Sequence, residues 1–252
     1  MKNFKKILLT MAMTMALGTS AFAASGFEFI FQFDGGINYT IPTQESKDLG
    51  MNGGLGGFAG VDAQIGYMFQ VKEGFGISLL AELGYSLDIY NLSDSSTKTQ
   101  LQVGNETYEA SWVMSQNYHN FKVGLLPKFN IGVGNKGAIS LGIGGGVKIP
   151  MAGYSRFGLQ YYYDDGNGNL QLATDGIDMY MKRQDISDLF SPSVIGYMKV
   201  TFDYYLFFTD NIGMNFGFYL GGDFTPKVKE FKIGGDAFDF GLQLGFRFGP
   251  KA

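Results

Sequence analysis

The residues that could carry chemistry are few, and each lacks the neighbours that a reaction would need. The sequence has a single histidine, His119, and no cysteine, so it offers no thiolate nucleophile and no thiolate metal site. A histidine can act as a general base, but the His-x-Ser spacing of one kind of hydrolytic site is absent because position 121 is Phe121. We interpret His119 as a solvated interfacial histidine and expect no enzyme activity, with a catalytic histidine as the alternative.

A second candidate is Asp165-Gly166-Asn167-Gly168-Asn169, which has the D-x-N-x-N spacing of a calcium loop. The sixth position of an EF-hand loop is glycine and the twelfth is glutamate, but here these positions hold Leu170 and Gly176. Tyr161-Tyr162-Tyr163 precedes the segment and Leu170-Gln171-Leu172 follows it, so a hairpin tip explains it more simply. We expect no metal and no cofactor, and calcium binding is the alternative.

The elements that position these residues are recognised from a two-residue alternation of polarity. In Gly76–Tyr90 every odd position from Ile77 to Ile89 is apolar, whereas the even positions carry two carboxylates, hydroxyls, a glycine and one leucine. This period predicts a β-strand with one dry face and one polar face. The same pattern predicts seven more strands, at 27–39, 58–69, 118–131, 138–149, 194–208, 212–223 and 238–248. No helical pattern follows that could cover their apolar faces.

These strands predict an all-β fold, an eight-stranded antiparallel up-and-down transmembrane β-barrel with its apolar face in lipid and its polar face in the lumen. The connections alternate between short ones, at 70–75, 132–137 and 209–211, and long ones. Outer-membrane barrels have short turns on the periplasmic side and long loops outside. We therefore expect both termini on the periplasmic side and two long extracellular loops, Asn91–Asn117 and Pro150–Ser191.

The N-terminus has the pattern of an export signal. Lys2, Lys5 and Lys6 precede a short apolar run at 7–17, and Ala21-Phe22-Ala23 matches a cleavage site. We predict a cleaved signal peptide at residues 1–23 and one barrel domain at residues 24–252, located in the outer membrane of a diderm bacterium. The net charge of −4 argues against nucleic acid as a partner.

Charged side chains on the inward parity predict a network that fills the barrel. An eight-stranded barrel is only wide enough for side chains, and buried charges have to be paired. Acids are concentrated on the first three and last two strands and lysines on the middle strands, so we expect pairing across a plugged lumen. The predicted network consists of Glu28, Asp62, Glu82, Lys122, Lys128, Lys148, Lys199, Asp203, Asp239 and Arg247.

Two local details can also be predicted. If the turn Thr209–Asn211 sets the register, Lys199 faces Gly221, Asp203 faces Gly217 and Phe207 faces Gly213, so that large inward groups oppose glycines. Pro127 falls within a strand, where it cannot donate a ladder hydrogen bond, and we expect a bulge or a missing bond there.

Taken together, these features resemble the small outer-membrane β-barrel superfamily, which includes the OmpA transmembrane domain, OmpX and OmpW. The last strand, FDFGLQLGFRF at 238–248, looks like the insertion signal read by the barrel-assembly machinery. The resemblance implies that membrane lipids and this machinery are partners. Among such barrels, some enzymes modify lipid A through a histidine at the rim, and the deacylase type needs the His-x-Ser motif that this chain lacks.

We expect a structural or surface-interaction role, similar to that of an adhesin, with an unidentified extracellular ligand. Four aromatic residues in the long loops could contact a partner, or could pack the loops together: Trp112, Tyr161, Tyr162 and Tyr163. The alternative is a narrow OmpW-like channel or a binder of small apolar solutes, lined by Leu80, Leu126, Ile195 and Phe207. A soluble lipocalin-like binder would need the reverse polarity.

Overall fold

The computed structural model describes residues 25–93, 99–103, 106–164 and 169–251. The predicted signal peptide at 1–23 lies outside the described residues. Within these ranges, the model has no helix with the length and apolar character to cross a bilayer.

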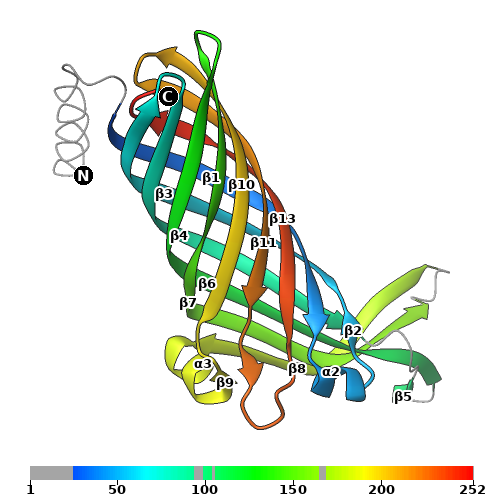
Figure 1. The fold of residues 1–252 in the computed structure, drawn as a ribbon. Helices are drawn as coiled ribbons and strands as arrows, with labels where there is room; N and C mark the ends of the chain where they lie inside the picture. The colour runs from blue at the N-terminus through cyan, green and yellow to red at the C-terminus, as the bar shows by residue number, and fades with distance from the viewer. Residues whose placement is uncertain (1–24, 94–98, 104–105, 165–168, 252) are drawn as a thin grey trace, which may run out of the picture.

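Eight antiparallel strands form a ring (Figure 1), and each pairs with two neighbours in the order β1–β3–β4–β6–β7–β10–β11–β13, with β13 pairing back to β1. The predicted fold class is confirmed. The ring strands are β1 Gly26–Pro42, β3 Leu55–Lys72, β4 Phe75–Ser93, β6 Glu106–Val133, β7 Gly137–Asp164, β10 Ile195–Thr209, β11 Ile212–Phe224 and β13 Gly235–Phe248.

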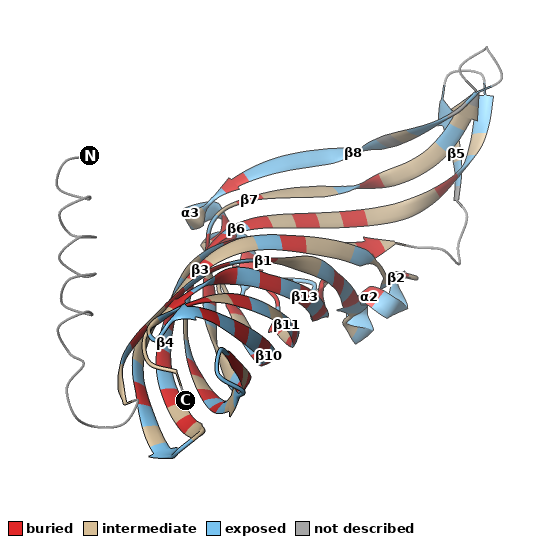
Figure 2. Ribbon diagram, turned by 90° about the horizontal axis from the view of Figure 1, so that it is seen from above, coloured by how far each residue is buried: buried red, intermediate tan, exposed pale blue. Residues whose placement is uncertain are grey.

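The polarity of the ring is inverted relative to a soluble protein. Leu83 and Phe240 are 42% and 45% exposed, whereas Glu82 and Lys128 are 1% and 0% exposed. Bands of buried and exposed residues alternate along the barrel strands in Figure 2, as expected when successive side chains point to opposite faces. The predicted orientation, with apolar residues outside and ionisable residues inside, is confirmed.

The three pairs predicted from the turn after β10 are confirmed, but their assumed origin is wrong: the register shifts between Phe207 and Thr209, so that Thr209 and not Phe208 pairs with Ile212. Lys199 pairs with Gly221, and Phe207 pairs with Gly213. Asp203 pairs with Gly217, where an added Cβ would lie 2.2 Å from the Asp203 carboxylate. At Pro127 the pairing between β6 and β7 is interrupted after Leu125 and resumes at Lys128 in the same register, so a gap in the ladder and no bulge accommodates the proline.

The two long connections were predicted as loops, and this prediction is wrong for most of their length. β6 begins at Glu106 and β7 continues to Asp164, so both strands extend well beyond the barrel (Figure 1). β8 (Leu170–Lys182) pairs along β7, and β5 (Thr99–Val103) pairs with β6. On β7 the sequence pattern was missed because the pairing with β6 shifts register between His119 and Asn120, which changes the parity of the inward positions of β7.

Short elements complete this end of the barrel. α2 (Gln44–Asp48) is capped at its N-terminus by Thr43, whose hydroxyl accepts a hydrogen bond from the Ser46 N–H. β2 (Asn52–Gly53) pairs with β4. α3 (Arg183–Leu189) follows β8, and β9 (Phe190–Ser191) pairs with β12 (Lys227–Val228). These elements lie at the end of the barrel opposite both termini (Figure 1).

Candidate functional site

The lumen holds the densest group of ionisable side chains in the described part of the chain. Each of them is inward because it occupies the polar parity of a strand whose other face is apolar. Buried charges of this kind are tolerated only when they are paired and hydrogen-bonded. The lumen contains three groups of such contacts: one near α3, one in the middle and one near the short turns.

The group nearest α3 is built around Lys148. Its Nζ lies 2.8 Å from Asp88 Oδ1 and 2.6 Å from Asp223 Oδ2. The Tyr90 hydroxyl donates a hydrogen bond to Asp223 at 2.6 Å, and the Asn120 amide donates one to Asp88 at 2.7 Å. Lys148 is on β7, whereas its partners are on β4 and β11, so these ion pairs join strands that are not adjacent in the ring.

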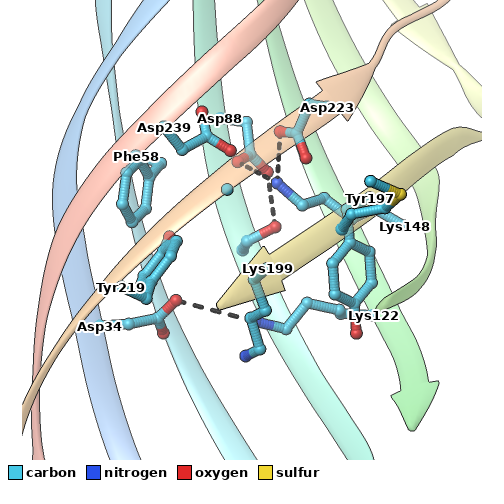
Figure 3. Close-up of a pocket in the computed structure, with 13 residues that line it drawn as sticks. Asp34, Phe58, Asp88, Lys122, Lys148, Tyr197, Lys199, Tyr219, Asp223 and Asp239 are labelled. Carbon is cyan, nitrogen blue, oxygen red and sulfur yellow. Dashed lines mark hydrogen bonds and ion pairs between the residues drawn. The ribbon is translucent and has the colours of Figure 1, made fainter. Parts of the chain in front are cut away.

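The middle group contains two lysines and three carboxylates. Lys122 Nζ lies 2.6 Å from Asp62 Oδ2, 3.6 Å from Glu82 Oε1 and 3.7 Å from Asp34 Oδ2. Lys199 Nζ lies 2.5 Å from Glu82 Oε2, and it reaches from β10 across the lumen to β4. Figure 3 shows the side chains of Lys122 and Lys199 converging on the same part of the lumen. The contacts tie five strands together, namely β1, β3, β4, β6 and β10.

The group nearest the short turns contains two separate ion pairs. Lys128 Nζ lies 2.9 Å from Asp203 Oδ2 and 3.1 Å from the Tyr205 hydroxyl. Arg247 Nε lies 3.1 Å from Glu28 Oε1, and the Arg247 guanidinium lies 4.5 Å from the centre of the Tyr205 ring. Arg247 is fully buried, so this end of the lumen is also filled by side chains.

Nine of the ten residues in the predicted network therefore make ion pairs, and Asp239 is the exception among them. Asp239 is 3% exposed and lies near Asp223 in Figure 3. Three acids that the predicted set omitted also take part, namely Asp34, Asp88 and Asp223. Parity alone already places all three at inward positions of their strands, although the predicted network did not include them.

The space left between these groups is small. A cavity of about 10 Å³ lies among the acids, lysines and tyrosines of the group nearest α3 and of the middle group (Figure 3). A cavity of this size has room for about one water molecule. Apolar clusters also lie inside the barrel, one near α3 containing Tyr118, Ile186 and Phe190 and the other near the short turns containing Leu126 and Phe207.

The predicted apolar lining does not form one pocket. Leu80, Leu126 and Phe207 belong to the cluster near the short turns, but Ile195 packs with Ile186 in the cluster near α3. Along β4 and β6, Glu82 and Lys122 lie between the two clusters. The prediction of a single apolar pocket from these four residues is therefore wrong, because parity fixes the face of a strand but says nothing of the height along the barrel.

The predicted surface aromatics lie on the sheet formed by β5, the outer part of β6 (106–117), the outer part of β7 (151–164) and β8, which we call the outer sheet. Trp112 stacks on Phe157 at 5.0 Å, and Tyr161 lies 6.4 Å from Tyr163. Tyr162 points to the opposite face and is 63% exposed. The structure thus brings three of the four aromatics to one face.

The two other candidates have simple surroundings. His119 is exposed, and its Nδ1 lies 2.5 Å from the Tyr85 hydroxyl. Residues 165–168 of the calcium-like segment lie outside the described residues, and the flanking pair Asp164 and Leu170 places the segment at the end of a hairpin. The described residues contain no group of three or more His, Cys, Asp or Glu side chains arranged to hold a metal ion.

A ring of eight antiparallel strands with an apolar exterior and a charged interior is the architecture of one kind of membrane protein. The fold is that of a small outer-membrane β-barrel. The resemblance noted from the sequence is thereby confirmed at the level of the fold.

Comparisons with known proteins assign this chain to no family. No family model matches the sequence, and no curated protein matches it. Among solved structures, Neisserial surface protein A (NspA) has 9% identity over 89% of this chain and 99% of its own, with a TM-score of 0.38. The outer membrane protease OmpT from Escherichia coli has 9% identity over 92% and 99%, with a TM-score of 0.40. The outer membrane protein OprG from Pseudomonas aeruginosa has 10% identity over 91% and 97%, with a TM-score of 0.35.

Proposed function

We propose that this chain is exported by a cleaved signal peptide, is inserted by the barrel-assembly machinery into the outer membrane, and acts there as a surface-interaction protein. In this proposal the barrel is an anchor, and the outer sheet is the working surface. The carrying observation is strand length. β6 and β7 are each 28 residues long, whereas a tilted membrane strand needs only about 9–11 residues. The excess forms a sheet beyond the barrel (Figure 2).

The filled lumen supports an anchoring role for the barrel. Ion pairs join strands across the lumen, and the cavity among them is no larger than a water molecule. A narrow channel is the alternative, and it requires the charged groups to separate. We therefore expect no stable conductance from the purified protein in a planar bilayer, and no liposome swelling with small sugars or amino acids.

The distal half of the hairpin between β7 and β8 can be removed in register. Phe157 on β7 pairs with Ile177 on β8, so a two-residue Asn-Gly turn can replace residues 158–176 and close a shorter hairpin in register. The shortened hairpin keeps Arg156 and Asp178, which form a bidentate ion pair with distances of 2.7 and 2.8 Å. A control variant places the same Asn-Gly turn at Asp210-Asn211, at the opposite end of the barrel.

The test compares both variants with the full chain in cells. We expect all three proteins to be folded, as judged by the heat-dependent shift of barrels on gels, and only the hairpin variant to lose surface adhesion or partner binding. Protease added to whole cells should cleave the full chain within the outer sheet. Unchanged envelope and binding phenotypes in the hairpin variant would remove the basis for the proposal.

A further inference from the structure

The strand β8 has one unpaired edge. It pairs with β7 along its whole length, from Leu170 opposite Asp164 to Lys182 opposite Ala152. In the part of the chain that the structure describes, no strand pairs with its other side, and Figure 2 shows β8 at the margin of the outer sheet. On a strand paired on one side only, every second residue directs its N–H and C=O groups away from the sheet. These groups can pair with another strand.

Although β8 carries charged side chains, this edge lacks most of the other features that usually prevent pairing. Proteins protect edges with short strands, prolines, bulges or inward charges. β8 has 13 residues, contains no proline and keeps one register with β7 throughout. Four of its side chains are large, apolar or aromatic, and open to solvent: Leu172 is 50% exposed, Ile177 70%, Met179 42% and Tyr180 83%.

One face of the outer sheet would extend across the edge. Residues that pair in neighbouring antiparallel strands point to the same face. Met114 pairs with Phe157, and Phe157 pairs with Ile177, so an apolar row crosses the sheet from β6 to the open edge. A partner strand with an apolar side chain opposite Ile177 would continue this row and cover Ile177.

The charge of the outer sheet selects among partners. The side chains that the structure describes there include four carboxylates and two cations, namely Glu106, Glu109, Asp175, Asp178, Arg156 and Lys182. One carboxylate and one cation, Asp178 and Arg156, pair with each other. The remaining excess of negative charge opposes the approach of a second copy of the same sheet and favours a basic partner.

We propose that the free edge of β8 binds an extended segment of a different protein, with alternating apolar and basic residues, which adds as a further antiparallel or parallel strand. The unpaired backbone groups require a polypeptide in extended conformation, the row ending at Ile177 requires apolar residues on one face, and the charge requires basic residues. This proposal rests on the surface role proposed above.

The first experiment uses the full chain in detergent or nanodiscs and three fluorescent decapeptides. One peptide alternates valine and lysine, the second alternates valine and glutamate, and the third has the lysines of the first but proline in place of its central valines. Fluorescence anisotropy should give a dissociation constant for the valine-lysine peptide about tenfold or more below the constants for both others. Equal binding of the proline peptide would overturn the proposal, because charge alone would explain it.

The second experiment uses a matched pair of variants. Ile177→Lys places a positive charge at the open edge, and Tyr162→Lys places the same charge on the opposite face of the neighbouring strand. We expect Ile177→Lys to weaken binding of the valine-lysine peptide about tenfold and Tyr162→Lys to change it less than twofold. Both positions are exposed, and the heat-dependent gel shift checks that both variants fold.

Three results would count against the edge proposal: no peptide binding, an unchanged constant for Ile177→Lys, or self-association seen as a disulfide between copies of Ile177→Cys in membranes. The surface role has a separate test. Peptide binding to the purified chain combined with an outer sheet that protease cannot reach on whole cells would contradict the surface role and leave the edge proposal standing. Cleavage on cells without peptide binding would contradict the edge proposal alone.

Discussion

The ion pair between Lys128 and Asp203 offers the sharpest test of how the lumen is stabilised. Both side chains are fully buried, and Lys128 Nζ lies 2.9 Å from Asp203 Oδ2. Replacing Lys128 with methionine preserves most of the side-chain volume but leaves the Asp203 carboxylate buried without a cation. Removing one partner of a buried pair costs about 3–5 kcal/mol. We expect a loss of that size in the free energy of unfolding.

The double variant Lys128→Met, Asp203→Asn separates pairing from volume. Asparagine has the shape of aspartate without its charge, so we expect the double variant to be more stable than Lys128→Met, with a coupling energy of about 2–3 kcal/mol between the two sites. Unfolding by guanidinium in detergent, followed by far-UV circular dichroism, measures this. The single tryptophan, Trp112, is in the outer sheet and does not report on the lumen.

A loss below about 1 kcal/mol for Lys128→Met, or a double variant no more stable than Lys128→Met, would refute this reasoning. The first result would mean that water screens the pair as it screens surface pairs. The second would mean that Lys128 acts through its volume or through the Tyr205 hydroxyl, which lies 3.1 Å from its Nζ.

Three further predictions concern packing, pH and permeation. Gly84→Ala should destabilise the barrel by about 1–3 kcal/mol, because the added Cβ would overlap Asp62 Oδ1. Gly35→Ala should be close to neutral, because the nearest atom to its added Cβ is 3.5 Å away. Guanidinium unfolding compares the two variants. The hydrogen bond from Arg156 lowers the pKa of Asp178 from 3.8 to about 2. The stability that this pair adds to the outer sheet is therefore present above about pH 4 and is lost as the pH falls through 2. Amide hydrogen exchange along β8 should show loss of protection only in that low range, and exchange that accelerates between pH 7 and 5 would contradict the prediction. The purified chain should show no stable open conductance in planar bilayers, and large, steady openings would contradict a plugged lumen.

The barrel could be predicted from the sequence because lipid imposes a strict rule on each strand. Every lipid-facing position of the stretch 76–90 is apolar, and the same rule sets the boundaries of the other strands within a few residues, except at the outer ends of β6 and β7. The rule ends where the strands leave the membrane. Phe157 and Trp112 lie on the face that continues the lumen, where the barrel carries charges, so a search for the same polarity interprets this region as a loop.

The candidate site was predictable in membership but not in pairing. Parity placed Lys148, Asp88 and Asp223 inside the barrel, but Lys148 lies on β7 and its partners lie on β4 and β11. Which groups meet across the lumen depends on strand tilt and on the height of each residue along the barrel, and neither follows from the local pattern. The same reason explains why Ile195 was grouped with the wrong apolar cluster.

The orientation of the side chains is the claim on which the rest depends, and the lack of native cysteine makes it directly measurable. Spin labels can be attached at Leu83→Cys and Phe240→Cys in protein reconstituted into bilayers. Collisions of a label with dissolved oxygen report contact with lipid, and collisions with a water-soluble nickel complex report contact with water. The account predicts that both labels collide with oxygen and are protected from nickel, whereas a label at Ser140→Cys, on the inward face, is protected from both. Labels at 83 and 240 that collide with nickel and are protected from oxygen would contradict it.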